Sequence, residues 1–244
     1  GNTQSQGLDG SDITTPNDEI HADAGDDTVV GGDGNDDLFG DDGQDDVQGQ
    51  AGEDYVSGGA NDDIVAGGDQ NDFVFGDDGN DTLYGGAGDD GFGLAAYFDD
   101  ILAGADAGND LLYGGEGNDL VLDLAGDNTL YGDSGNDQVF ASIGDDLLYG
   151  GADNDLLGGA SFADILQSGN DTLYGDAGDD SLADGYGNNL LYGGTENDYV
   201  TVGDGDDTIY GGEGRDFILG GGGNDLIYAG AGIDDVYGGE GGDT

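Results

Sequence analysis

The stretch Gly76-Asp77-Asp78-Gly79-Asn80-Asp81-Thr82-Leu83-Tyr84 decides the fold of this chain. Its first six residues are glycines, carboxylates and an amide, and its last three form a short β-prone segment. Nearly everything from Asp18 to Thr244 is a variant of this nonapeptide, laid end to end. A period this short predicts a repeat architecture in which each unit stacks on its neighbours.

Numbering each repeat from 1 to 9 places an aspartate at position 6 and an aliphatic residue at position 8. One inward aliphatic residue flanked by outward residues predicts a strand of only about three residues, which is stable only when other strands stack on it. The position-8 residues are Ile20, Val29, Leu38, Val47, Val56, Val65, Val74, Leu83, Leu112, Val121, Leu130, Val139, Leu148, Leu157, Leu173, Leu182, Leu191, Val200, Ile209, Ile218, Ile227 and Val236.

Glycine dominates positions 1, 2 and 4, and its freedom to adopt positive φ allows tight turns between the short strands. Tyr113, Tyr131 and Tyr149 follow one another at intervals of 18 residues, so odd and even repeats should lie on two different sheets. We therefore expect an all-β fold, a flattened right-handed parallel β-roll with two nonapeptide repeats per 18-residue coil. Roughly 12 coils would extend about 60 Å at the usual spacing between strands.

Two intervals break the period. Tyr84 and Tyr113 are 29 residues apart, and Tyr149 and Tyr174 are 25 apart. We interpret each interval as one coil with an inserted loop, which predicts longer coils near 91–103 and 158–168 within a single roll over 18–244. Residues 1–17 form a degenerate N-terminal repeat or a cap. The chain begins without methionine and stops within a repeat, as a processed product or a fragment would.

The composition requires a counter-ion. The chain has 57 Asp and Glu residues against 1 Lys or Arg, and a formal net charge of -56. Self-repulsion of this size opposes compaction, so a bound cation is the simplest way to complete the fold. An acidic surface that serves only solubility would scatter its carboxylates, whereas here aspartate returns every nine residues. Nucleic acid and anionic membranes are excluded as partners by charge, and no apolar run is long enough for membrane insertion.

The unit G-G-x-G-x-D-x-(aliphatic)-x, as in 31–39, 114–122 and 220–228, resembles the calcium-binding nonapeptide of the repeats-in-toxin (RTX) family. The resemblance covers nearly the whole chain. It implies that the position-6 aspartate binds Ca²⁺ together with carbonyls of its own turn and of the next turn along the same edge. The candidate ligands are Asp27, Asp36, Asp45, Asp54, Asp63, Asp72, Asp81, Asp110, Asp119, Asp137, Asp146, Asp155, Asp171, Asp180, Asp198, Asp207, Asp216, Asp225 and Asp234.

Some repeats depart from the pattern. Position 6 is Asn128 or Asn189 in two repeats, where we expect weak or empty sites. Arg215, beside Asp216, is expected to replace or weaken an ion. Roughly 20 calcium ions would offset about 40 negative charges, which is comparable with the excess. Four repeats lack glycine at position 4, which should strain the turn: they carry Asn61, Gln70, Asp153 and Glu196.

The position-9 tyrosines should point outward. They either form a stacking ladder that reinforces the sheet or offer a face for lateral contact or for a glycan. The sequence contains no cysteine and a single histidine, and no catalytic constellation emerges, so we expect no enzymatic activity.

The resemblance implies export in the unfolded state through a type I secretion channel of a Gram-negative bacterium. The sequence therefore predicts an extracellular, calcium-binding structural protein that folds on calcium binding. Self-association has two candidate surfaces, namely the open ends, which would yield a filament or surface layer, and the Tyr face. The alternative is an RTX calcium-binding or secretion module of a larger secreted toxin, hydrolase or adhesin.

Overall fold

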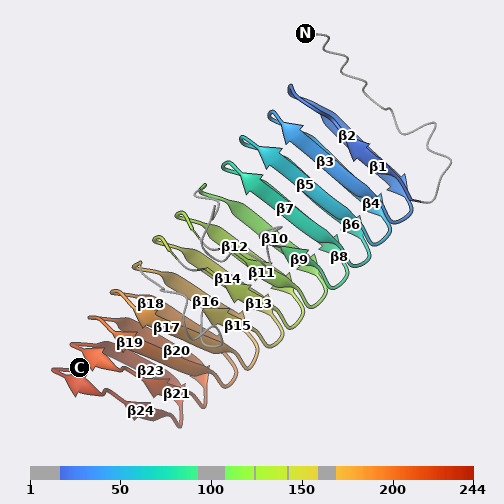
Figure 1. The fold of residues 1–244 in the computed structure, drawn as a ribbon. Coiled ribbons are helices and arrows are strands. Elements are labelled where there is room, and N and C mark those ends of the chain that lie inside the picture. The colour runs from blue at the N-terminus through green and yellow to red at the C-terminus, as the bar shows by residue number, and fades with distance from the viewer. Residues whose placement is uncertain (1–16, 93–107, 124, 142, 159–168) are drawn as a thin grey trace.

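The computed structural model describes residues 17–92, 108–123, 125–141, 143–158 and 169–244. In this part of the chain the regular elements are parallel β-strands, stacked into two long sheets that face each other (Figure 1). The predicted all-β parallel roll is therefore confirmed. Over the same residues, none of the elements is a helix with the length and apolar character needed to cross a membrane.

The two sheets divide the repeats between them. The first sheet contains β1 (Glu19–His21), β3 (Asp37–Asp42), β5 (Tyr55–Ala60), β7 (Phe73–Asp78), β9 (Gly91–Phe92), β11 (Leu120–Leu122), β13 (Gln138–Phe140), β15 (Leu156–Gly158), β17 (Ser181–Tyr186), β19 (Tyr199–Asp204), β21 (Phe217–Leu219), β22 (Gly222–Gly223), β24 (Asp235–Tyr237) and β25 (Glu240–Gly241). The second sheet contains β2 (Thr28–Asp33), β4 (Asp46–Ala51), β6 (Ile64–Asp69), β8 (Thr82–Ala87), β10 (Leu111–Glu116), β12 (Thr129–Ser134), β14 (Leu147–Ala152), β16 (Thr172–Ala177), β18 (Leu190–Thr195), β20 (Thr208–Gly214) and β23 (Leu226–Gly232).

The register follows the 18-residue period. Leu112 pairs with Leu130 and Leu130 with Leu148, and the pairing remains continuous across both long intervals, where Tyr84 pairs with Tyr113 and Tyr149 with Tyr174. The second sheet has 11 strands, so the roll has about 11 coils, slightly fewer than expected. Residues 1–16, 93–107 and 159–168, which include most of the predicted cap and inserted loops, lie outside the described residues.

The strands are longer than the predicted three residues. Most span six residues, such as Thr82–Ala87, which covers positions 7, 8 and 9 and then positions 1, 2 and 3 of the next repeat. The reason is visible in the pairing between β8 and β10, which lapses at position 1 and resumes when Gly86 pairs with Gly115. The glycine-rich segment therefore bends the strand without ending it, and the true turn is confined to positions 4 to 6.

The core is a single file of position-8 side chains between the sheets. These side chains are essentially inaccessible from Leu38 to Ile218, and each buried aliphatic side chain stabilises the fold by roughly 1.5–3 kcal/mol. At the C-terminal end Ile227 is only partly buried and Val236 is 42% exposed. Because each coil contributes only two such residues, the apolar core alone is thin.

A row of tyrosines stacks along the outside of the second sheet. The ring centroids lie 4.7 to 5.3 Å apart and neighbouring ring planes are within 7° of parallel. These separations are favourable for offset stacking, and the rings cover one another's faces. The geometry agrees with the stacking-ladder interpretation. This Tyr row consists of Tyr84, Tyr113, Tyr131, Tyr149, Tyr174, Tyr192, Tyr210 and Tyr228.

The turns explain why position 4 is usually glycine. At Gly135 φ is 133°, and an added Cβ atom would collide with the carbonyl oxygen of Gly117 one coil earlier. Where other residues occupy position 4, they hold left-handed φ values that cost of order 1–3 kcal/mol. The predicted strain is therefore present at Asn61 (φ 87°), Gln70 (84°), Asp153 (79°) and Glu196 (77°).

Candidate metal centre

The position-6 residues form two ladders, one along each edge of the roll where the turns lie. Every aspartate predicted as a ligand lies in one of them, and the ladders also include three aspartates that the prediction omitted. The first ladder contains Asp18, Asp36, Asp54, Asp72, Asp90, Asp119, Asp137, Asp155, Asp180, Asp198, Asp216 and Asp234. The second contains Asp27, Asp45, Asp63, Asp81, Asp110, Asn128, Asp146, Asp171, Asn189, Asp207, Asp225 and Asp243.

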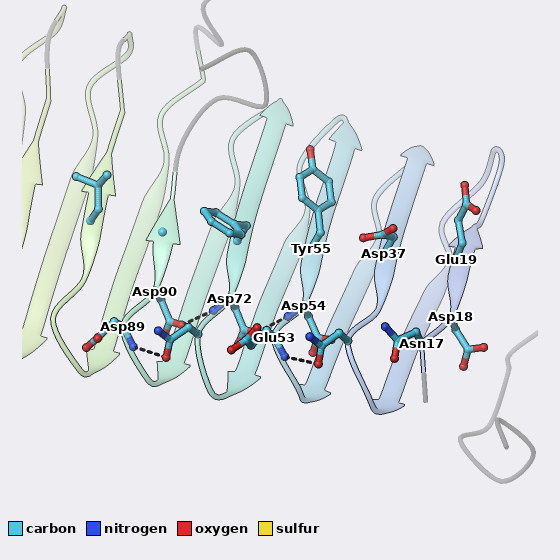
Figure 2. A pocket seen from close by; sticks show the side chains of 15 residues that line it. Asn17, Asp18, Glu19, Asp37, Glu53, Asp54, Tyr55, Asp72, Asp89 and Asp90 are labelled. Atoms are coloured by element: carbon cyan, nitrogen blue, oxygen red, sulfur yellow. Dashed lines mark hydrogen bonds between the residues drawn. The ribbon is translucent and has the colours of Figure 1, made fainter. Parts of the chain in front are cut away.

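One oxygen of each ladder carboxylate binds the neighbouring coil. The backbone N–H of Asp54 donates to Oδ1 of Asp72, and that of Asp72 to Oδ1 of Asp90, both at 2.8 Å (Figure 2). The contacts persist across the long coils, where the N–H of Asp90 reaches Oδ1 of Asp119 at 2.7 Å. Each carboxylate is therefore fixed in orientation by a backbone group and does not rotate freely.

The second oxygen of most ladder carboxylates is buried and has no hydrogen-bond partner. A buried acceptor of this kind costs about 1–3 kcal/mol, and more when it is charged. Calcium prefers carboxylate and carbonyl oxygens, so a row of oriented, unsatisfied oxygens fits this ion. The Oδ2 atoms in this state belong to Asp36, Asp45, Asp54, Asp63, Asp72, Asp90, Asp119, Asp137, Asp146, Asp155, Asp180, Asp198, Asp207, Asp216 and Asp225.

Backbone carbonyls converge on the same places. A Cβ atom added to Gly114, at position 1, would lie 2.5 Å from Oδ2 of Asp119 in its own repeat and 2.6 Å from the carbonyl oxygen of Gly132 one coil later. Gly193 has the same surroundings. Glycine at position 1 thus leaves room for oxygens from two consecutive coils to approach one another, which is the combination that the family resemblance implies.

Burial shifts the protonation of these groups. It raises the pKa of Asp63 and Asp207 to about 6, of Asp72 and Asp119 to about 7, and of Asp155 to about 8. The charges of neighbouring ladder carboxylates raise the pKa further, while the backbone N–H donors oppose the shift. Without a cation the most strongly shifted of these carboxylates, such as Asp72, Asp119 and Asp155, are therefore partly protonated at neutral pH.

A second, solvent-exposed row of side chains was not predicted from the sequence. The position-5 residues accept hydrogen bonds in the opposite direction, from the following coil: the N–H of Glu53 donates to Oδ1 of Asn35 at 3.1 Å, and that of Asp89 to Oδ1 of Asn71 at 3.1 Å (Figure 2). The signal for this row was the frequent Asn or Asp at position 5. It aligns successive turns without burying charge.

Asp90 was also omitted from the predicted ligands, although it is 3% exposed and belongs to the first ladder. Its repeat carries Phe92 at position 8, so the aliphatic marker is absent there. The preceding run 85–90 has the usual composition and could have identified it.

The repeats with asparagine at position 6 keep the ladder intact. Oδ1 of Asn189 accepts the N–H of Asp171 at 3.0 Å, and Oδ1 of Asn128 accepts that of Asp110 at 2.9 Å. Arg215 likewise leaves the ladder undisturbed, because its guanidinium pairs with the exposed carboxylate of Asp235 at 2.7 Å, whereas Asp216 is 1% exposed. The structure thus places the one arginine outside the ladder, next to a different carboxylate from the one expected.

The ladders do not gather many acidic groups at one point. In the described ranges, no three Asp, Glu, His or Cys side chains form a group that could hold a metal ion. A calcium ion on a ladder would therefore take one or two carboxylates, and backbone carbonyls and water would supply the remaining ligands.

Comparison with known proteins identifies the class. The family model described as the RTX calcium-binding nonapeptide repeat matches residues 17–47, 39–74, 57–92, 104–139, 131–166, 167–183, 184–218 and 210–244. The chain therefore belongs to the family of RTX calcium-binding nonapeptide repeat proteins. No curated protein matches the sequence.

Among solved structures, the crystal structure of a hyperactive, Ca²⁺-dependent, β-helical antifreeze protein from an Antarctic bacterium is similar at 22% identity. The alignment covers 93% of this chain and 82% of that protein, with a TM-score of 0.36. These values describe a distant similarity.

Proposed function

We propose that this chain is an extracellular structural protein that remains unfolded until calcium binds and then forms the roll. The observation that carries the proposal is the pair of ladders, in which Oδ2 atoms such as those of Asp72, Asp119 and Asp155 are buried without a hydrogen-bond partner. In an unfolded chain these carboxylates are solvated and the sites do not exist, so the binding energy of the metal becomes folding energy.

The proposed setting follows from calcium supply. Extracellular calcium-binding modules work with dissociation constants of about 10⁻⁴ to 10⁻³ M, a concentration range that cytosol does not reach. RTX repeats are typical of secreted proteins, which supports an extracellular location and export of the unfolded chain. We propose roughly 20 bound ions, about one for each ladder position.

Removing one ladder carboxylate should weaken cooperativity without preventing folding. For Asp119→Ala we expect a shallower calcium titration and a nearly unchanged final β signal, because the stability of a repeat protein is a sum over neighbouring units. Circular dichroism during calcium titration measures both quantities. Glu116→Ala, which removes an exposed carboxylate from the same repeat, is the control and should titrate like the unmodified chain. Equal steepness for Asp119→Ala would contradict a role in calcium binding.

We further propose that folded rolls associate end to end. The support is the last coil, where the position-8 residue Val236 is 42% exposed, whereas position 8 is fully covered in the middle of the roll. A second copy stacked on this coil would bury the side chain of Val236 and pair the open strands, and contacts that do not close produce fibres. The Tyr row is a weaker surface for association because its rings already cover one another's faces.

Electron microscopy in millimolar calcium tests this assembly. We expect filaments whose width is that of a single roll, and their disappearance when Val236 is changed to Asp. Monodisperse particles of the unmodified chain under these conditions would reject end-to-end assembly and favour the alternative of a calcium-binding module of a larger secreted protein.

The proposed role is non-catalytic. Strongly perturbed ladder acids, such as Asp155 and Asp198, are held by backbone contacts and have equivalents in the neighbouring coils. Their raised pKa values follow from a repeated structural arrangement, and we assign them to metal binding.

A further inference from the structure

Two repeats carry a paired replacement. Asparagine stands at position 6 only at Asn128 and Asn189, and between Asp18 and Thr244 an acidic residue stands at position 1 only at Asp123 and Asp184, in the same two repeats. Each of these repeats therefore keeps one carboxylate at positions 1 and 6 taken together, but the carboxylate has moved from position 6 to position 1.

The ordinary repeat shows where a position-1 side chain points. The Cβ site at Gly132 is 2.5 Å from Oδ2 of Asp137 and 2.6 Å from the carbonyl oxygen of Gly150. A carboxylate at position 1 would therefore lie against the Oδ2 atom of its own repeat. Asparagine at position 6 removes that charge, and its amide turns away: Nδ2 of Asn189 faces the carbonyl of Tyr186 at 3.4 Å.

The displaced carboxylate meets a ladder aspartate of the preceding coil. Asp184 is only 5% exposed, and its carboxyl group is hydrogen-bonded to that of Asp171. Its Oδ1 also accepts the N–H of Tyr186 at 3.4 Å, as Oδ1 of Asp123 accepts the N–H of Ala125 at 3.2 Å. The two replaced repeats thus share this contact of the position-1 carboxylate, and in one of them two buried carboxyl groups come into direct contact.

Two further oxygens flank this pair. Asp146 and Asp207 lie on either side of it in the second ladder, are 3% and 1% exposed, and have Oδ2 atoms without hydrogen-bond partners. The charge of Asp171 acts on Asp146 and that of Asp207 on Asp184. Arg215, the only Lys or Arg in the sequence, pairs with Asp235, so no side chain of permanent positive charge neutralises these buried carboxylates, and an external cation would do so.

We propose that Asp171 and Asp184 together form a two-carboxylate calcium site, that Asp110 and Asp123 form its counterpart, and that both bind calcium more tightly than the single-carboxylate sites of the ladders. The inference rests on the proposed calcium-dependent function. Calcium affinity increases with the number of charged ligands, and the main chain of Asp184 occupies the position that supplies the carbonyl ligand in an ordinary coil.

Both proposed sites lie directly after the two lengthened coils. Asp110 and Asp171 are the first position-6 aspartates of the second ladder after the two lengthened coils, which separate them from the preceding member by 29 and 25 residues. Closing a longer loop costs more conformational entropy. A tighter ion immediately after each insertion offsets that cost where the stacking of coils is most difficult to complete. The asparagine repeats, which we expected to bind weakly, thus each strengthen the preceding site.

Calcium-binding isotherms of the full 244-residue chain test the inference. In flow dialysis with calcium from micromolar to millimolar concentrations, we expect the unmodified chain to show two ions bound roughly tenfold or more tightly than the remainder. Asp184→Asn should remove one ion from the tight class, and Asp123→Asn combined with Asp184→Asn should remove both. Asp204→Asn, which neutralises an exposed carboxylate one coil later, is the matched control and should leave the tight class unchanged.

The same variants distinguish ligation from a structural hydrogen bond. In the variant Asp184→Asn the side-chain amide can still donate a hydrogen bond to Asp171. If Asp184 has only a structural role, this variant should therefore keep both tightly bound ions, and that result would overturn the inference. The double change Asp184→Gly with Asn189→Asp restores the ordinary repeat. This variant should bind as many ions in total as the unmodified chain, but with one ion fewer in the tight class. If the unmodified chain binds no calcium, the proposed function itself fails, whereas a single uniform class of many ions overturns only this inference.

Discussion

Excess chelator at neutral pH and low ionic strength is expected to abolish most of the β-sheet signal of this chain in circular dichroism. The coil over residues 129–146 buries two aliphatic side chains, Leu130 and Val139, worth roughly 1.5–3 kcal/mol each. It also buries the carboxylates of Asp137 and Asp146, whose desolvation costs several kcal/mol per ion when no partner is present. The two contributions are of similar size before the net charge of -56 is considered.

Readdition of calcium should restore the signal. Magnesium at the same concentration should restore much less, because it demands octahedral geometry and gives up its water reluctantly. High concentrations of monovalent salt should recover only part of the structure, since they screen exposed charges but not buried ones. A substantial β signal in excess chelator at low salt would refute calcium-coupled folding.

Acidification is expected to stabilise the metal-free fold and to weaken calcium binding. An aspartate has a pKa near 3.9 when unfolded, and burial raises that of Asp72, Asp119 and Asp198 to about 7 in the fold. A raised pKa means that the protonated group favours folding, so this stability is complete below about pH 4 and is lost as the pH rises through 6 to 8. The metal-free chain should therefore gain β structure on acidification.

Calcium must displace the same protons. The half-saturating calcium concentration should increase as the pH falls from 8 to 5, and calorimetry in buffers of different ionisation enthalpy should detect proton release. Asp155→Asn, at the carboxyl group with a pKa of about 8, should stabilise the metal-free fold at pH 7.5 and weaken calcium binding. Asp206→Asn, at an exposed position-5 residue, should do neither. A half-saturation that does not change across this pH range would contradict the role of the buried ladders.

The sequence pattern predicted the features that follow from the spacing of residues along the chain. The return of an aliphatic residue at position 8 identified the core file from Leu38 to Ile218, and the spacing of Tyr113, Tyr131 and Tyr149 separated the two sheets. The position-6 aspartates were predicted to share two edges, and they do. Residue spacing is sufficient to predict these features because the repeat imposes the same register on every coil.

Features that depend on contacts between different positions were missed. The pairing of Asp184 with Asp171 joins position 1 of one coil to position 6 of the preceding one, and only the fold brings these positions together. The six-residue strands were missed because glycine at positions 1 and 2 normally signals a turn, whereas here neighbouring coils hold it within the sheet. Both features depend on contacts with the coils above and below, which the sequence of a single nonapeptide does not contain.

The Tyr row has an optical consequence. The chain contains no tryptophan, so tyrosine dominates its near-ultraviolet absorption. In the roll the phenol rings from Tyr84 to Tyr228 lie parallel at separations near 5 Å, close enough for their electronic transitions to couple along the row. In the unfolded chain the same chromophores are separated and randomly oriented. The row is thus a built-in chromophore array whose rotational strength reports how many consecutive coils have closed.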